Sequence, residues 1–221
     1  MCRRGGGTAI AALVICVPLG ALFADSVNRL QAAGLDVSPL TDAGRRLVVD
    51  AEDGTRYITT RPSDVPTYVE AGAADLGIVG KDVLRESQPD VYELVDLDFG
   101  HCRMVYATLD GEDPTPGALA HLGAVRVATK YPNIARRHFA ATGRAVEVVK
   151  VNGSVEVAPL VGLSHGIVDL TATGRTLVEN GLVVREEILE ASARLIANRV
   201  SHKVSSGVVD ELIARLEPRT S

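Results

Sequence analysis

The segment VRVATKYPNIARRHFAATGRAVEVVKVNGSVEVAPLVGLSHGIVDL, residues 125–170, decides the fold class. Its apolar residues gather at 125–129, 145–151 and 166–170 in short runs typical of strands. Between these runs, residues 132–142 and 154–163 space their apolar side chains as helices do. Strands that alternate with helices of this length pair in parallel through right-handed crossovers. The sequence therefore predicts an α/β fold.

Further elements are predicted on both sides of this segment. Asp53 and Gly54 suit a tight hairpin turn between strands at 46–50 and 56–60. Ser63 is expected to cap the helix that follows. The other expected elements are strands at 75–80, 92–99, 103–109 and 188–198, and helices before residue 123 and over 208–216.

Composition excludes some classes of protein. The 221 residues carry 23 Lys and Arg against 28 Asp and Glu, a formal net charge of −5, which argues against a nucleic-acid binder. With 46% hydrophobic and 23% charged residues, the chain folds, as one large domain or two small lobes. Cys2, Cys16 and Cys102 match neither a disulfide framework nor zinc-ligand spacing. We expect them to be reduced thiols in a reducing cytosol.

The first 24 residues allow two interpretations. Arg3 and Arg4 precede an apolar stretch at 8–22, as in a secretory signal. Pro18 and Gly20 interrupt this stretch, which is also too short for a membrane-spanning helix. We favour a strand at 11–17, a turn at 18–20 and a helix at 22–33, because the run continues directly into an amphipathic helix pattern.

The segment DLTATGRTL, residues 169–177, carries the most informative chemistry. It follows a predicted strand and precedes a helical run, so free backbone N–H groups gather where an anion binds. Gly174 lets the backbone approach a ligand closely, and Asp169 could hold ribose hydroxyls or a magnesium ion. Hydroxyl donors come from Thr171, Thr173 and Thr176. A capped strand-to-helix turn without a ligand explains the same loop, so the loop alone leaves both interpretations open.

These residues, with others spread over the chain, resemble a known family. The signature of the ATP phosphoribosyltransferases, the enzymes that open histidine biosynthesis, is matched by Glu156, Gly162, Ser164, Ile167, Asp169, Thr173, Gly174, Thr176 and Leu177. Similar stretches are Arg61 with DVP at 64–66, EAGAADLGIVGKD at 70–82, CRMV at 102–105, KYPN at 130–133 and GSVE at 153–156. They cover nearly the whole chain in the right order.

The resemblance implies an architecture and partners. The fold would consist of two α/β lobes similar to type II periplasmic binding proteins, with the active site in the cleft between them. Lobe I would comprise residues 1–99 plus 188–221, and lobe II, residues 100–187, would carry the phosphoribosyl pyrophosphate loop. At 221 residues the chain resembles the short form of the family. This form implies a cytoplasmic hetero-oligomer with a regulatory subunit similar to histidyl-tRNA synthetase, and neither nucleic acid nor membrane as a partner.

The implied reaction joins the adenine N1 of ATP to C1 of phosphoribosyl pyrophosphate and releases pyrophosphate. Its oxocarbenium-like transition state needs orientation and charge stabilisation more than a protein nucleophile. Asp169 and Glu156 would be the catalytic residues that hold the ribose. The 5-phosphate would be bound by Thr171, Ala172, Thr173, Gly174, Arg175 and Thr176. Other substrate contacts are expected from Gly20, Arg61, Asp82, Arg103 and Lys130, with Lys81 as a further candidate cation. Magnesium would bridge pyrophosphate oxygens without a preformed protein site.

Two departures from the family pattern leave alternatives open. Leu19 and Ala21 flank Gly20 where the family usually carries a lysine and often an arginine. His165 stands where an acid is more common, and either replaces it or partners a helix dipole. One alternative is a secreted solute-binding protein of the same lobe architecture, with the N-terminus as a true signal. The other is a weakened paralogue that serves mainly as a subunit.

Overall fold

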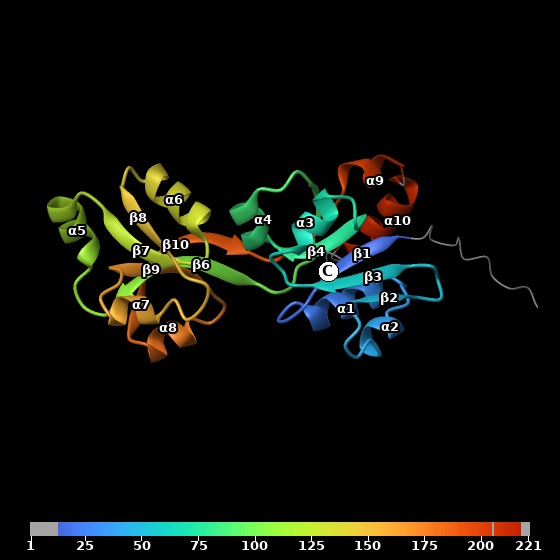
Figure 1. Cartoon of the computed structure of the whole chain (residues 1–221), viewed down its shortest axis with the longest axis horizontal. Coiled ribbons are helices and arrows are strands. Elements are labelled where there is room, and N and C mark those ends of the chain that lie inside the picture. The colour runs from blue at the N-terminus through green and yellow to red at the C-terminus, as the bar shows by residue number, and fades with distance from the viewer. Residues whose placement is uncertain (1–12, 205, 218–221) are drawn as a thin grey trace, which may run out of the picture. The chain divides into compact units, whose positions relative to one another are not determined.

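The computed structural model describes residues 13–204 and 206–217, which form two compact units (Figure 1). Unit 1 comprises the described residues up to Leu84, Gln88–Gly100 and the described residues from Ser192 onward; unit 2 comprises Arg85–Ser87 and His101–Ala191. The first half of the possible signal segment, which includes Cys2 and the first two residues of the strand expected at 11–17, lies outside the described residues. Within the described ranges, no helix is long and apolar enough to cross a bilayer.

Unit 1 contains a six-stranded sheet in the order β2-β3-β1-β4-β11-β5. Its strands are β1 (Val14–Pro18), β2 (Val48–Asp50), β3 (Arg56–Thr60), β4 (Leu76–Gly80), β5 (Tyr92–Asp96) and β11 (Ala193–Ala197). β1 runs parallel to β3 and β4, whereas β2 and β11 pair antiparallel to their neighbours. The carboxyl ends of β1, β3 and β4 therefore meet at one edge of this sheet.

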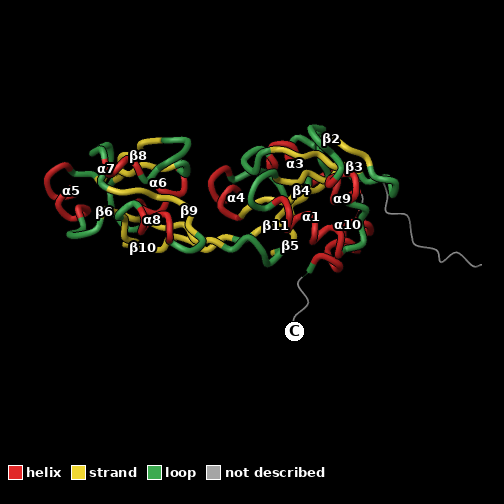
Figure 2. Tube along the Cα trace, turned by 90° about the horizontal axis from the view of Figure 1, so that it is seen from below, coloured by secondary structure: helices red, strands yellow, loops and turns green. Residues whose placement is uncertain are grey.

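Helices cover both faces of the unit 1 sheet. They are α1 (Phe23–Ala32), α2 (Ser38–Thr41), α3 (Val65–Glu70), α9 (Arg199–Val204), α10 (Ser206–Leu216) and the first part of α4 (Lys81–Ser87), whose last three residues fall in unit 2. Along β1, Ile15 and Val17 join the core cluster that includes residues of α1 and α10, two neighbouring helices (Figure 2). Cys16, between them, joins the opposite cluster with Val65 and Val69 of α3. This alternation is the period of two that a strand imposes on a sheet buried on both faces.

Unit 2 contains a five-stranded sheet in the order β10-β6-β9-β7-β8. Its strands are β6 (Cys102–Leu109), β7 (Val125–Thr129), β8 (Val146–Lys150), β9 (Gly166–Thr171) and β10 (Leu182–Ala191), and its further helices are α5 (Pro114–Leu122), α6 (Pro132–Ala141), α7 (Val157–Leu160) and α8 (Arg175–Glu179). Residues of α5 and α6 belong to one core cluster, and residues of α7 and α8 belong to the other (Figure 1). β7, β8 and β9 pair in parallel, which confirms the central prediction.

Three local expectations need correction. The N-cap residue of α3 is Asp64 and not Ser63, whose hydroxyl donates to the Asp64 carboxylate instead. The helix expected at 154–163 shrinks to α7, because Ser154 has a positive φ of 46° and Gly162 one of 73°. The strand expected at 188–198 is two strands, since β10 pairs with β6 in unit 2 and β11 pairs with β4 and β5 in unit 1. Residues 187 and 188, between which the lobe boundary is predicted, both belong to β10.

Candidate substrate-binding site

The threonine-rich loop of unit 2 connects β9 to α8. Gly174 takes the N-cap position of α8 with a φ of 76°, a conformation that favours glycine. The Thr171 hydroxyl accepts a hydrogen bond from the Gly174 N–H at 2.8 Å, and the Thr173 hydroxyl accepts one from the Arg175 N–H at 3.4 Å. Ala172, Thr173, Arg175 and Thr176 are exposed. The loop therefore has a defined backbone and an exposed set of hydroxyl and N–H groups, although α8 has only five residues and a correspondingly small dipole.

Asp169 lies at the start of this loop, near the end of β9. Its Oδ1 accepts the Leu170 N–H at 2.9 Å. Burial raises the pKa of the Asp169 carboxyl, the Leu170 hydrogen bond and the Lys130 charge lower this pKa, and the Glu156 charge raises it. Lys130 follows β7 and Glu156 follows β8, so the parallel strands bring all three charges to one edge of the sheet. The structure thus brings these three predicted residues together.

Thr129, the last residue of β7, was missed by the sequence prediction. Its side chain is wholly buried, and its hydroxyl donates to the Val168 carbonyl at 2.6 Å. The same hydroxyl accepts the Tyr131 N–H at 2.8 Å. A threonine at the end of an apolar strand carries no local signal for such a bond, because Val168 lies 39 residues further along the chain.

Arg103 also lies beside the threonine-rich loop. In the antiparallel pair of β6 and β9, Arg103 stands opposite Thr171, where the loop begins. Its Nη1 lies 3.0 Å from Oε2 of Glu187, and both side chains are more than 40% exposed. The guanidinium is therefore near the loop, but an anionic ligand would compete with Glu187 for it.

The predicted site residues of unit 1 follow its parallel strands. Pro18 pairs with Thr60, and the Leu19 N–H donates to the Thr60 carbonyl, so Gly20 and Arg61 follow two neighbouring strand ends. Gly20 has a φ of 85°, with open space around it. Asp82 is buried in the first turn of α4, after β4, where its carboxylate lies so close to Gly80 that a Cβ there would collide with it.

Two other charged candidates have structural partners. The Lys81 ammonium, expected as a possible substrate cation, lies 2.5 and 2.7 Å from the two carboxylate oxygens of Glu93. A substrate phosphate would compete with Glu93 for this ammonium, and a role for Lys81 in binding substrate stays a prediction. The imidazole Nδ1 of His165 accepts the backbone N–H of Arg126, and the backbone N–H of His165 donates to the Arg126 carbonyl. These bonds tie the segment before β9 to the beginning of β7, away from the edge that carries Asp169.

Comparison with known proteins shows the family. The family model described as ATP phosphoribosyltransferase matches residues 61–218. The ATP phosphoribosyltransferase of Rubrobacter xylanophilus is 54% identical over 203 residues, which are 91% of this chain and 94% of that protein. The chain belongs to the ATP phosphoribosyltransferase family. In the solved ATP phosphoribosyl transferase (HisG:HisZ) complex from Thermotoga maritima, the similar chain is 32% identical with a TM-score of 0.80, over 92% of this chain and 96% of that one.

This membership confirms the predicted family, its enzyme class, a pentosyltransferase, and the size of the short form. The aliphatic sulphonate binding protein SsuA from Escherichia coli is 13% identical with a TM-score of 0.57, over 93% of this chain and 71% of that one. At this identity the likeness shows the fold alone, and it confirms the predicted similarity to periplasmic binding proteins. It therefore gives no support to a solute-binding function.

Enzymes of the ATP phosphoribosyltransferase family need a divalent metal. Among the residues that the structure describes, no three His, Cys, Asp or Glu side chains gather as a metal cage. The oxygen ligands near the threonine-rich loop are the Asp169 and Glu156 carboxylates and the threonine hydroxyls. One carboxylate oxygen of Asp169 already accepts a hydrogen bond from the Leu170 N–H. This donor set fits a metal that enters bound to substrate phosphate oxygens.

Proposed function

We propose that this chain transfers the phosphoribosyl group of phosphoribosyl pyrophosphate to N1 of the adenine ring of ATP, and that unit 2 binds the phosphoribosyl donor. One observation carries this proposal. A half-buried carboxylate, Asp169, is coupled to Lys130 and Glu156 and stands directly before a loop of exposed hydroxyls around the left-handed Gly174. A carboxylate beside an anion-binding loop is the pattern expected for a ribose 5-phosphate ligand.

Each group in unit 2 has a proposed task. The backbone and hydroxyls of residues 171–176 bind the 5-phosphate, with Ala172 and Arg175 contributing through the backbone of the exposed loop. Asp169 and Glu156 accept hydrogen bonds from the ribose hydroxyls, which fixes the ring and favours the positive charge that develops at C1. Lys130 and Arg103 attract the pyrophosphate. The adenine N1 lone pair then forms the bond to C1, while the C1–O bond breaks and its electron pair leaves with pyrophosphate.

Unit 1 is proposed to bind ATP. Gly20 gives the loop after β1 an open backbone, Arg61 supplies a guanidinium after the neighbouring strand β3, and Asp82 follows β4. Because Lys81 is paired with Glu93 and residue 19 is leucine, Arg61 is the cation that we assign to the phosphates of ATP at this edge. Magnesium is the proposed metal, and when bound to the pyrophosphate oxygens it neutralises charge on the leaving group.

A regulatory partner is part of the proposal. The similar chain of Thermotoga maritima was solved as a HisG:HisZ complex, and this chain covers 96% of it. We therefore infer that the chain assembles with a subunit similar to histidyl-tRNA synthetase in the cytoplasm.

The test is formation of phosphoribosyl-ATP from ATP, phosphoribosyl pyrophosphate and magnesium, with the chain alone and with such a partner. Asp169→Asn is expected to lower kcat by about 100-fold or more, because it removes a charge that acts in the transition state. Asp110→Asn is the matched control, since Asp110 also accepts the N–H of the next residue, Gly111. Asp110 follows the carboxyl end of β6, which runs antiparallel to β9, so it lies at the opposite edge of the sheet from Asp169. We expect it to retain activity.

Three outcomes separate the alternatives. Equal loss in both variants would contradict the role of Asp169. No product from the folded chain, with or without the partner, would contradict the transferase and favour the weakened paralogue. A large gain of activity on Leu19→Lys would support the same alternative, because it would show that a missing cation limits turnover.

A further inference from the structure

The buried side chain of Thr129 connects the backbone segments next to two charged residues of the site, Asp169 and Lys130. Its hydroxyl donates to the Val168 carbonyl at 2.6 Å and accepts the Tyr131 N–H at 2.8 Å. Val168 directly precedes Asp169, and Tyr131 directly follows Lys130. One hydroxyl group therefore forms a hydrogen bond with the backbone directly before Asp169 and another with the backbone directly after Lys130.

The strand pairing alone does not fix this geometry. The parallel register of β7 and β9 ends with Thr129 opposite Val168. Beyond this pair, β9 continues beside β6 as far as Thr171, whereas the chain after β7 turns towards Pro132 at the start of α6. Lys130 lies in that turn, outside the register between β7 and β9. The Thr129 hydroxyl is thus a side-chain bridge at the position where the ladder between β7 and β9 stops.

We propose that Thr129 is a positioning residue whose two hydrogen bonds set the backbone of Lys130 against that of Asp169, so that both charged side chains are held in place for the phosphoribosyl donor. This inference rests on the proposed function, in which Asp169 binds the phosphoribosyl group. The groups that act on Asp169 are Lys130 after β7, Glu156 before α7 and the Leu170 N–H. Lys130 is the cation among them, so the distance from Lys130 to Asp169 controls how far the positive charge offsets burial and Glu156.

Thr129→Val tests this role, because valine keeps the shape of threonine and removes the hydroxyl. We expect kcat to fall by about 10- to 100-fold, since small displacements of catalytic groups have effects of this size, with a much smaller change in the KM for ATP. Thr129→Ser keeps the hydroxyl and is expected to retain most of the activity. If Thr129→Val does not fold, Thr129→Ala removes the same hydroxyl with less crowding.

Thr108→Val is the matched control. Thr108 is also wholly buried in unit 2, and its hydroxyl donates to the Leu109 carbonyl and accepts from Arg185 Nε. It stands opposite Gly166, at the other end of β9 from Asp169. We expect Thr108→Val to lose stability without a change in kcat, whereas a purely structural role for Thr129 would make the two variants alike.

Two measurements need no turnover. In metal-free buffer, the ¹³C carboxyl signal of Asp169 should titrate at a higher pH in Thr129→Val than in the wild type, and at an unchanged pH in Thr108→Val. Amide exchange at Tyr131 should accelerate by about fivefold or more in Thr129→Val, because its acceptor is gone. If the wild-type chain makes no product, these two results still test Thr129, so failure of the proposed function is distinguishable from failure of this inference.

A double-mutant cycle with Lys130→Met decides whether Thr129 acts through Lys130. If it does, adding Thr129→Val to Lys130→Met should change kcat by no more than about twofold. It should also leave the Asp169 titration where Lys130→Met alone puts it. Full additivity in the cycle would overturn the proposal. So would equal loss of kcat in Thr129→Ser and Thr129→Val, or an unchanged Asp169 titration in Thr129→Val.

Discussion

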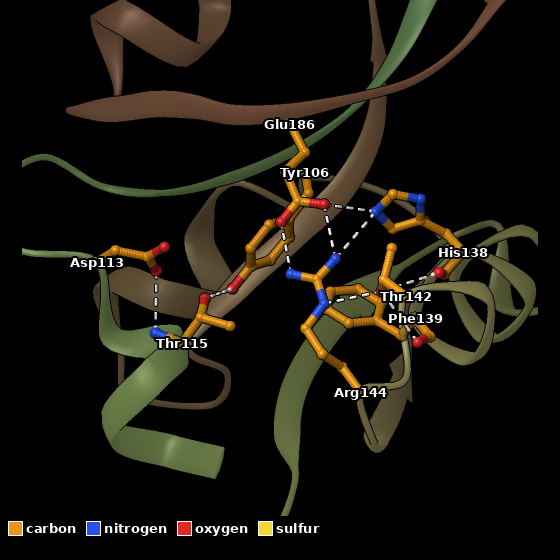
Figure 3. Close-up of polar contacts among 8 residues, drawn as sticks. All are labelled: Tyr106, Asp113, Thr115, His138, Phe139, Thr142, Arg144 and Glu186. Atoms are coloured by element: carbon orange, nitrogen blue, oxygen red, sulfur yellow. Dashed lines mark hydrogen bonds and ion pairs between the residues drawn. The ribbon is translucent and has the colours of Figure 1, made fainter. Parts of the chain in front are cut away.

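Glu186 holds together a charged cluster in unit 2 whose contribution to stability is measurable. Its two carboxylate oxygens lie 2.5 and 2.6 Å from Nη1 and Nη2 of Arg144, and one of them lies 2.7 Å from Nε2 of His138 (Figure 3). The Arg144 guanidinium also stacks over the ring of Phe139 at 4.6 Å. The side chains of Glu186, Arg144 and His138 are 31%, 18% and 14% exposed. The cluster therefore connects α6 and the segment after it to β10 in a largely desolvated setting.

Glu186→Gln is expected to lower the free energy of unfolding by about 2 kcal/mol. This value lies between the 0–1 kcal/mol typical of exposed ion pairs and the 3–5 kcal/mol typical of removing one partner from a buried pair. For a chain of this length it corresponds to a fall in Tm of about 4–8 °C. Glu147→Gln is the control, because Glu147 pairs with Arg126 at 3.2 Å with side chains 61% and 41% exposed. Its loss is expected to stay within about 0.5 kcal/mol.

The pH dependence gives the same prediction a second readout. The hydrogen bonds from Arg144 lower the pKa of Glu186, with a smaller contribution from His138, against the opposing effect of burial. Below the ordinary glutamate value of 4.5, the unfolded chain therefore takes up a proton before the folded one does. The stabilisation is complete above this value and is lost as the pH falls towards the folded pKa. The difference in unfolding free energy between wild type and Glu186→Gln should shrink over this interval, as followed by calorimetry or denaturant titration. Equal losses in Glu186→Gln and Glu147→Gln, or a difference that persists unchanged down to pH 3, would refute this reasoning.

Two further predictions concern Asp169 and a close contact in the unit 2 sheet. Because burial raises the pKa of Asp169, the folded state binds a proton more readily than the unfolded one, and stability falls as the pH rises from 3.8 through the folded pKa. Asp169→Asn should remove that slope and raise Tm at neutral pH by about 2–4 °C while activity is lost; a lower Tm would show that the charge stabilises the fold. A Cβ on Gly166 would lie 2.6 Å from the Tyr106 ring and 2.7 Å from a backbone oxygen, so Gly166→Ala should cost about 1–3 kcal/mol by denaturant unfolding. Gly117→Ala, in α5 with open space around it, should instead gain about 0.5–1 kcal/mol, and equal effects of the two substitutions would contradict the packing argument.

Local patterns in the sequence were sufficient for most strands and turns. β7 has the predicted bounds, because a run of β-branched and small residues ends at Lys130, in the turn before α6 begins at Pro132. The hairpin of β2 and β3 also forms where Asp53 and Gly54 predict it, and Gly54 has a φ of 91°. In both cases the deciding information lies within a few neighbouring residues. The resemblance to a family adds a prediction that local patterns lack, the order of the two lobes along the chain.

Other features depended on partners distant in the sequence. The apolar run at 188–198 looks like one strand, but Ser192 separates β10 from β11, and the two pair in different sheets. Hydrophobicity predicts that both parts are buried and does not predict the change of partner. In the same way, the sequence does not predict that the Lys81 ammonium contacts both carboxylate oxygens of Glu93, twelve residues away.

The candidate site combines both kinds of information, and this determines how its residues act. The loop at 169–176 is local, and its glycine and threonines identify it as a candidate anion site, although the loop alone leaves a ligand-free turn as an alternative. The charge state of Asp169 is not local, because it depends on Lys130 and Glu156 from two other strand ends and on burial within the sheet. Thr129 bridges the strand of Asp169 and the turn of Lys130 through a single hydroxyl. A substitution in the loop should therefore change mainly the binding of phosphate, whereas a substitution at Thr129 should change the ionisation of a carboxylate that it does not contact.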